Sequence, residues 1–407
     1  MYKVNKERLN DKIKTYSTFG DQGNGGITRF SLSPEDIMAR DEFVKRMTAI
    51  GAEITCDDMA NMYATLPGSE PGLPRIVTGS HCDSVRNGGN YDGILGVLAA
   101  MEVLETIAID KIPHRHPITA MIWTNEEGSF YPPAMMSSGV ICVKFEKETM
   151  LASKSAEDTI FGETLSKFKY KGDEKNRLNA NDYKAMVELH IEQGPILEAE
   201  QKDIGVVTCV IGMCNYRIKT YGQACHAGTT PMKYRKDALY AAAQLLMKLH
   251  EELDKLDPTL VYTTGEIICH PCVHTVIPDF VDFSIDARHE DPKVIAEVVK
   301  VIESLPEEIA KCRVETKRAW GRDTVYFDKE LVDTVKKTAD AFGYSNMRIN
   351  SGAGHDAQFV AGIIPTTMIF VPSRDGHSHC TTEHTSIEQC VQGANVLLNT
   401  ILEIDKK

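Results

Sequence analysis

The sequence predicts an α/β fold in which a second compact domain interrupts the first. A chain of 407 residues is too long for one ordinary core. Short apolar runs that read as buried strands alternate with amphipathic helical segments, which is typical of an α/β sheet. Near Gly212 the order of elements changes, and it changes back after Phe327. We therefore expect one domain made of residues 1–212 and 328–407, and an inserted domain at residues 213–327.

The first part of the chain reads as helices and strands in alternation. Ser33 can cap a helix that begins with Pro34, and Asp36 can complete a capping box. Residues 144–184 are polar and weakly periodic, which favours short helices and surface loops. The other predicted elements are a helix that ends near Gly51, strands at about 62–66, 75–79, 118–123 and 185–190, and a helix at 95–107.

The inserted segment has a pattern of its own. Its predicted order is strand, helix, strand, strand, helix, strand, which is the order of the ferredoxin-like unit. The six elements are expected at 216–221, 236–253, 260–269, 280–287, 292–309 and 314–319. Beyond the insertion the α/β pattern resumes with a helix at 329–342, a strand at 366–371 and a closing helix at about 386–401.

The composition argues against several classes of partner. The net charge is −13 and no basic run stands out, whereas nucleic-acid binding requires clustered Lys and Arg. There is no apolar run of roughly 18 residues and no apolar segment at the start, so we expect no membrane partner and a cytoplasmic location. Eleven scattered Cys residues fit reduced thiols better than a disulfide framework.

Several predicted strands stop at residues that bind metal ions. His81, Glu127 and His190 each follow or close such a strand. Because open α/β sheets form their sites at the carboxyl ends of the strands, we expect these side chains to meet. With Asp92 and His379 they supply enough ligands for two ions about 3.5–4 Å apart that share one carboxylate. Histidine and carboxylate together favour Zn²⁺, Mn²⁺, Co²⁺ or Ni²⁺ over Ca²⁺.

Glu126 lies directly before the proposed ligand Glu127. Neighbours on a strand point to opposite faces, so both can reach one site only where the strand has ended, and Gly128 permits such a break. One carboxylate can then bind metal while the other takes a proton from a water molecule. Asp83 faces the same way as His81 and can hydrogen-bond its imidazole, which would fix the tautomer. Taken singly, each of these residue pairs is also common on solvated surfaces.

The motifs at these positions extend over most of the chain. They are Gly79-Ser80-His81-Cys82-Asp83, Tyr91-Asp92-Gly93, Asn125-Glu126-Glu127-Gly128, Glu188-Leu189-His190-Ile191-Glu192-Gln193-Gly194-Pro195, His226-Ala227-Gly228-Thr229-Thr230-Pro231, Ser351-Gly352-Ala353-Gly354-His355-Asp356 and Gly376-His377-Ser378-His379. From about residue 10 to the end, the chain resembles the M20 metallopeptidase clan. Within that clan it is most similar to the branch of N-carbamoyl-L-amino acid hydrolases, allantoate amidohydrolases and β-ureidopropionases.

The resemblance implies a mixed-sheet di-metal hydrolase domain with an inserted ferredoxin-like lid and dimerisation domain, and hence a homodimer. It also implies a role for each candidate ligand. His81 and His190 bind separate ions, Asp92 bridges them, Glu127 and His379 complete the two shells, and Glu126 is the general base.

The resemblance further suggests which residues bind a small substrate that carries a carboxylate. His226 is similar to a family histidine that stabilises the oxyanion, often across the dimer, although a histidine packed in a Gly-rich turn is an alternative. Arg288 matches a position that binds the substrate carboxylate, and its alternative is a surface ion pair. Thr275 stands where the family commonly has Asn, and Thr reaches less far. The remaining candidates near the substrate are Gln193, Gly354 and His355.

The expected reaction is hydrolysis of an N-carbamoyl-L-amino acid to the L-amino acid, CO₂ and ammonia. Allantoate amidohydrolase, β-ureidopropionase and dipeptidase activities use the same metals and stay open. A non-catalytic binding protein is a further alternative, although such relatives typically lose a ligand or the base.

Overall fold

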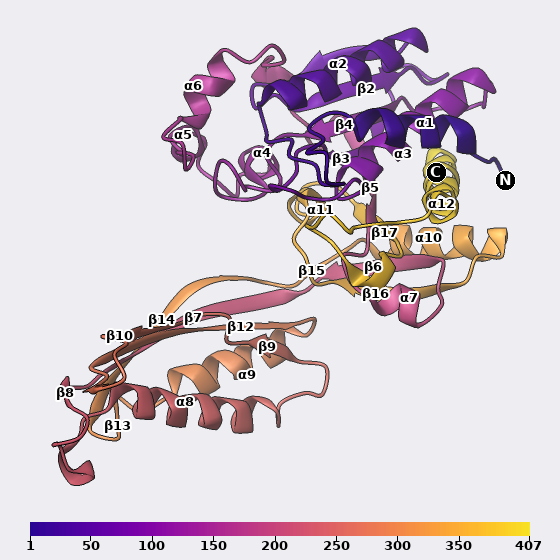
Figure 1. Ribbon diagram of the computed structural model, residues 1–407. Helices are drawn as coiled ribbons and strands as arrows, with labels where there is room; N and C mark the ends of the chain where they lie inside the picture. The colour runs from indigo at the N-terminus through magenta and orange to yellow at the C-terminus, as the bar shows by residue number, and fades with distance from the viewer. The chain divides into compact units, whose positions relative to one another are not determined.

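The computed structural model describes all residues, Met1–Lys407, and they form two compact units (Figure 1). The first unit comprises Met1–Thr208 and Tyr326–Lys407. The second comprises Cys209–Val325. None of the helices combines the length and the apolar composition needed to cross a lipid bilayer.

The first unit is built on a nine-stranded sheet with the strand order β1-β2-β4-β3-β5-β17-β6-β15, and β16 pairs with β6. Strand β3 is parallel to β4 and β5, and β17 is parallel to β5. Strands β2 and β6 run antiparallel to their neighbours β4 and β17, so the predicted mixed sheet is confirmed. The strands are β1 (Glu53–Cys56), β2 (Met62–Leu66), β3 (Arg75–His81), β4 (Ile118–Trp123), β5 (Tyr183–Ile191), β6 (Ile204–Val210), β15 (Val325–Tyr326), β16 (Asn346–Ser351) and β17 (Thr366–Val371).

Helices pack on this sheet and on one another. Helix α3 contacts β3, β4 and β5, and it is buried over nearly its whole length because α1, α2 and α12 also lie against it. The helices of this unit are α1 (Lys6–Tyr16), α2 (Pro34–Ala49), α3 (Ile94–Ile109), α4 (Met136–Ile141), α5 (Lys147–Leu151), α6 (Phe161–Ser166), α7 (Ile196–Ala199), α10 (Lys329–Phe342), α11 (Asp356–Val360) and α12 (Ile387–Asp405). Short 3-10 turns occur at Glu174–Asn176 and Arg374–Gly376.

The second unit is an antiparallel sheet with the order β10-β12-β7-β14-β13, in which β9 also pairs with β12. The central strand β7 lies between β12 and β14, and β10 pairs with β12. The order β14-β7-β12-β10 therefore corresponds to the fourth, first, third and second predicted strands. Helices α8 and α9 cover one face of the sheet (Figure 1). This confirms the predicted ferredoxin-like unit. Its elements are β7 (Gly212–Tyr221), β8 (Cys225–His226), a 3-10 turn (Met232–Tyr234), α8 (Ala238–Leu253), β9 (Val261–Thr263), β10 (Ile267–His270), β11 (Val276–Ile277), β12 (Phe280–His289), α9 (Pro292–Glu303), β13 (Glu308–Ile309) and β14 (Cys312–Arg322).

Some local predictions were wrong. The strand expected at 260–269 is two short strands, β9 and β10, and the helix expected at 292–309 ends at Glu303. The capping box at Ser33 is only half formed. The Ser33 hydroxyl accepts from the Asp36 amide, but the Asp36 carboxylate accepts from the Leu32 amide instead of closing the box. The Asp36 carboxylate also forms an ion pair with the buried Arg40, which engages it outside the capping box.

A buried ionic cluster joins α1 to α3. The Lys12 ammonium lies 2.7 Å from a Glu102 carboxylate oxygen and also contacts Glu105, and the Lys12 and Glu102 side chains are fully buried. Arg8 donates to Glu102 from the rim of the cluster. Buried ion pairs are costly to break from one side, because the remaining charge loses its partner.

Replacing Lys12 with Met should therefore lower the free energy of unfolding by about 3–5 kcal/mol. Urea denaturation followed by circular dichroism would measure this change. Lys45→Met is a matched control, since Lys45 pairs with Glu42 while its own side chain is 75 % exposed. Its unfolding free energy should change by less than about 1 kcal/mol. Equal midpoints for both variants would contradict a stabilising role for the cluster.

Candidate metal centre

Most of the predicted ligands lie at one edge of the first unit's sheet. Strand β3 ends at His81, and His190 is the second-last residue of β5. Glu126 and Glu127 follow the end of β4, and His379 follows β17. Because β3, β4, β5 and β17 are mutually parallel, their carboxyl ends meet at the same edge.

The first group of ligand atoms is formed by His81, Asp92 and His190, all buried. The two Nε2 atoms lie 3.6 Å and 3.3 Å from the same oxygen, Oδ1 of Asp92. Both rings approach one carboxylate oxygen, an arrangement that favours one shared ion over the separate ions expected for His81 and His190.

The second group uses the other oxygen of the same carboxylate. Nε2 of His379 lies 3.3 Å from Oδ2 of Asp92 and 3.3 Å from Oε2 of Glu127. Asp92 thus contributes one oxygen to each group, which is how a bridging ligand serves two ions. His379 is the only half-exposed member of the set, with a side chain 49 % exposed.

Backbone carbonyls fix the orientation of the two buried imidazoles. Nδ1 of His81 lies 3.0 Å from the carbonyl oxygen of Asp83, and Nδ1 of His190 lies 2.9 Å from that of Ile191. A carbonyl can only accept, so Nδ1 carries the hydrogen in both rings and Nε2 faces Asp92. The amide of Gly93 donates to Nε2 of His190, in keeping with this tautomer.

The Asp83 carboxylate has a different partner from the one predicted. It lies 3.7 Å from Nδ1 of His81, which is too long for a hydrogen bond. Its two oxygens instead accept from the amides of Glu126 and Glu127, each at 3.2 Å. Asp83 therefore orients His81 through its backbone and orients the two glutamates through its side chain.

The chain bends sharply where both glutamates enter the site. Asn125 has a φ of 59°, in the left-handed region, and Gly128 has a φ of 62°. This turn lets neighbouring residues reach one site, as the position of Gly128 predicted. Gly93 is needed for a second close approach, because a Cβ atom there would lie 2.2 Å from the His81 ring.

The site contains more carboxyl groups than its buried surroundings readily keep ionised. Burial, with the neighbouring Asp92, raises the pKa of Glu127 to about 8. Burial likewise raises the pKa of Glu126 well above its ordinary value. Burial lowers the pKa of His81, but Glu126 and the other carboxylates outweigh it, so the net shift is upward. The raised pKa values favour protons on these carboxyl groups, and a bound divalent cation would instead offset their negative charge.

The buried oxygens at the site without a hydrogen-bond partner include Oε1 of Glu127 and Oε1 of Gln193. Unpartnered buried acceptors are rare and costly, and a metal ion or a ligand would satisfy them. The mixed imidazole and carboxylate donors suit a first-row divalent ion. The residues present therefore fit the two predicted ions, of the Zn²⁺, Mn²⁺, Co²⁺ or Ni²⁺ class.

Residues 77–403 match the sequence profile of the peptidase family M20/M25/M40. The chain belongs to this family. It is 37 % identical to an N-carbamoyl-L-amino-acid amidohydrolase of Rhizobium meliloti, over 98 % of this chain and 97 % of that protein. It is 32 % identical to an allantoate amidohydrolase of Escherichia coli, over 96 % of both chains. A crystal structure of a hydantoinase/carbamoylase family amidase from Burkholderia multivorans superposes with a TM-score of 0.91 at 38 % identity, covering 100 % of this chain and 99 % of that one.

These similarities place the chain in the hydantoinase/carbamoylase branch of the M20 family. It is thus a metal-dependent amidohydrolase that acts on C–N bonds, as the sequence predicted. The family uses two metal ions, and the two ligand groups that share Asp92 are where this M20 amidohydrolase can hold them.

Two of the predicted substrate residues in the first unit lie against the ligands. The Gln193 amide nitrogen donates to Oδ2 of Asp92 at 2.7 Å. The ring of His355 lies edge-on to that of His190, with centroids 4.6 Å apart, and Gly354 precedes it in the turn before α11. Glu188, His190 and His355 form a third group of possible ligand atoms, which overlaps the first group through His190.

The other predicted substrate residues lie in the second unit. His226 pairs with Val276 in the short β8–β11 ladder, and the Ala227 amide donates to the carbonyl of Thr275. His226 and Thr275 are therefore neighbours. Arg288 is on β12, and its Nε donates to Asp286 at 2.7 Å.

Sequence reasoning missed Glu383, which contacts both the Asp92 loop and the His379 loop. It follows His379 by four residues in an irregular loop, so neither strand position nor helical spacing points to it. Only its closeness in sequence to the Gly376–His379 motif could have drawn attention to it.

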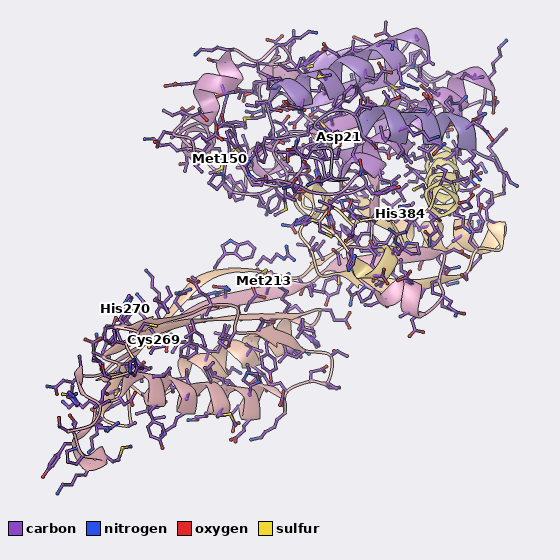
Figure 2. The ribbon with its side chains drawn as sticks, in the orientation of Figure 1. Asp21, Met150, Met213, Cys269, His270 and His384 are labelled. Carbon is purple, nitrogen blue, oxygen red and sulfur yellow. The ribbon has the colours of Figure 1, made fainter.

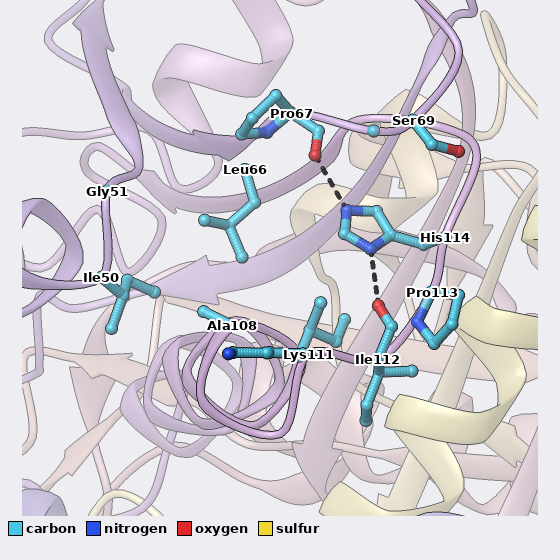
Figure 3. A pocket seen from close by; sticks show the side chains of 12 residues that line it. Ile50, Gly51, Leu66, Pro67, Ser69, Ala108, Lys111, Ile112, Pro113 and His114 are labelled. Atoms are coloured by element: carbon cyan, nitrogen blue, oxygen red, sulfur yellow. Dashed lines mark hydrogen bonds between the residues drawn. The ribbon is translucent and has the colours of Figure 1, made fainter.

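A surface pocket of about 530 Å³ lies elsewhere in this M20 amidohydrolase (Figure 3). His114 borders it, with Nδ1 3.0 Å from the carbonyl of Ile112 and Nε2 3.0 Å from that of Pro67. The lining residues precede β3 and β4, so the pocket is at the amino ends of these strands, opposite the metal centre. Its lining contains no carboxylate, and it does not contribute to the catalytic site.

Proposed function

We propose that this M20 amidohydrolase cleaves the carbamoyl C–N bond of N-carbamoyl-L-amino acids to give the L-amino acid, CO₂ and ammonia. One observation carries the proposal: two ligand groups share Asp92, while the buried carboxylate of Glu126 belongs to neither group and lies beside them. The similarity to the Rhizobium meliloti protein over nearly the whole chain supports this substrate class.

Two divalent ions held by these groups would supply Lewis-acid polarisation of the ureido carbonyl and a water molecule of lowered pKa. Glu126 is placed to act as the general base, with Oε2 3.5 Å from Nε2 of the ligand His81. Glu126 can take the proton from the attacking water and then donate it to the departing nitrogen.

His226 has the hydrogen-bonding pattern that an oxyanion requires. Its Nδ1 accepts from the amides of Gly228 and Thr229 at 3.0 Å and 3.2 Å. Nε2 therefore carries the hydrogen of the neutral ring, and the side chain is exposed. We propose that this N–H stabilises the oxyanion of the tetrahedral intermediate, with Thr275 beside it.

Arg288 would bind the substrate carboxylate, because a planar guanidinium suits two carboxylate oxygens. Arg288 pairs with Met213 at one end of the second unit's sheet. Tyr221 is at the other end, where Cys269 and His270 lie (Figure 2), and His226 follows Tyr221 in the chain and pairs with Val276 just before β12. Along β7, Met213 and Tyr221 are separated by roughly 26 Å at about 3.3 Å per residue.

An N-carbamoyl amino acid spans only a few bond lengths between its ureido carbon and its carboxylate. His226 and Arg288 of one chain therefore cannot contact the same substrate molecule. We propose that the protein is a homodimer whose second unit is the lid and dimerisation domain, and that each active site takes His226 from the partner subunit.

A substrate panel tests the proposed reaction. The protein, loaded with Mn²⁺ or Co²⁺, would be given N-carbamoyl-L-amino acids, their D enantiomers, N-carbamoyl-β-alanine, allantoate and dipeptides. Ammonia release and new primary amine would be measured together, because dipeptide cleavage yields amine without ammonia. We expect kcat/KM to be at least about 10-fold higher for an N-carbamoyl-L-amino acid than for the others.

Allantoate is the strongest competing substrate, since the Escherichia coli relative is an allantoate amidohydrolase. A kcat/KM that is highest for allantoate would replace the proposed substrate with this one. A preference for dipeptides would overturn the ureido specificity altogether.

A further inference from the structure

We propose that Glu383 is a positioning residue that joins the Asp92 loop to the Ser378–His379 loop and thereby assembles the second ligand group. The inference deepens the proposed function and rests on the two-ion centre that this function requires. Glu383 belongs to none of the ligand groups, so it acts through Asp92 and His379.

The two oxygens of the Glu383 carboxylate serve different loops. Oε1 accepts from the amides of Tyr91 and Asp92 at 2.8 Å and 3.0 Å. Oε2 accepts from the His379 amide at 3.3 Å and from the Ser378 hydroxyl at 3.2 Å. One buried carboxylate thus links two ligand-bearing segments that are far apart in the sequence.

The Ser378 hydroxyl adds a third link between these loops. Its oxygen lies 2.6 Å from Oδ2 of Asp92 as well as 3.2 Å from Glu383. A hydroxyl has one hydrogen and can donate it to only one of these carboxylates at a time. The shorter contact is to Asp92, so Ser378 holds Oδ2 of Asp92 in place while its own hydroxyl lies beside Glu383.

The His379 loop needs such support, because His379 has a φ of 57°. A left-handed conformation costs a residue other than Gly on the order of 1–3 kcal/mol and persists only where its surroundings enforce it. The hydrogen bond from the His379 amide to Glu383 is a contact that holds this conformation.

Gly89 provides independent support, because it leaves the space that Glu383 occupies. A Cβ atom at position 89 would lie 2.1 Å from Oε1 and 2.4 Å from Cβ of Glu383. Both ends of the Glu383 side chain would have to move. Gly89→Ala should therefore displace Glu383 without changing its chemistry.

The decisive experiment measures Co²⁺ binding to the full-length protein. Isothermal titration calorimetry and the visible absorption of bound Co²⁺ would both report it. In Glu383→Gln the side-chain oxygen can accept from one loop, but the amide group then meets the donors of the other loop. We expect the affinity for the second Co²⁺ to fall about 10- to 100-fold while the first is unchanged. Excess Co²⁺ should restore kcat, since Glu383 does not touch the substrate.

Gly89→Ala should weaken the second Co²⁺ site in the same direction. Glu388→Gln is the matched control, because Glu388 makes a surface ion pair with Lys6 and should keep both affinities. If Glu383→Gln does not fold by circular dichroism, Glu383→Asp decides the matter, because it keeps the charge but is too short to reach both loops.

Unchanged affinities for both Co²⁺ ions in Glu383→Gln and Gly89→Ala, or in Glu383→Asp if the Gln variant fails to fold, would overturn the positioning role. This metal-binding test and the substrate test of the proposed function can give different results. A wild-type protein that binds two Co²⁺ and loses the second in these variants, yet cleaves no ureido compound, would refute the function and leave the positioning role standing.

Discussion

Replacing Glu126 with Gln should lower kcat by about 10²- to 10⁴-fold while the protein still binds two divalent ions. Gln has nearly the same shape as Glu but cannot take a proton. Glu126 lies outside the two groups that share Asp92, so its loss should leave the ligands in place. Its amide also remains bonded to Asp83, which keeps the turn intact.

The adjacent residue supplies the matched control. Glu127→Gln changes the same functional group one position later, but Glu127 lies within the second ligand group. This variant should lose metal as well as activity, and added metal should restore part of the activity. Metal content by mass spectrometry and ammonia release from an N-carbamoyl-L-amino acid would separate the two variants. Near-normal turnover by Glu126→Gln would show that the base is another group.

The sequence predicted that His81, Glu127 and His190 would lie near one another, because each follows or closes an apolar strand. His81 and His190 end neighbouring parallel strands, and Glu126 and Glu127 follow a third. Apolar periodicity identifies such strands, and strand ends determine where the site forms. The same periodicity predicted the inserted ferredoxin-like unit.

The grouping of the ligands could not be obtained in this way. Which Asp92 oxygen faces His81 depends on the turn at Gly93 and on the carbonyl that accepts from Nδ1 of His81. Those contacts are set by backbone geometry rather than by residue type. Asp83 is a comparable case, since its spacing from His81 was right while its carboxylate serves the next loop.

Contacts between distant segments were also missed. Glu383 is 291 residues from Asp92, so no local pattern relates them. Helix α1 was not predicted either, because it is largely polar and buries a lysine. That lysine, Lys12, becomes acceptable in the core only because α3 presents Glu102 and Glu105 to it.

The proposed exchange of His226 between subunits leads to a second large effect. Each of the variants Glu126→Gln and His226→Ala should be about 10²-fold or more below wild type when measured alone. Mixed and allowed to exchange subunits, they should recover about one quarter of the wild-type rate, because half of the dimers are then mixed and each has one intact site. That intact site combines Glu126 of the His226→Ala chain with His226 of the other chain.

The mixing result depends on where His226 acts. If His226 served the active site of its own chain, every site in a mixed dimer would lack either the base or the oxyanion donor, and mixing would restore nothing. Mixing Glu126→Gln with Glu127→Gln is the control, because both residues lie on one turn of one chain and cannot complement each other. Recovery in the first mixture alone would therefore locate His226 across the dimer. No recovery, in a sample shown by sedimentation to contain exchanged dimers, would place His226 in its own subunit's site or outside catalysis.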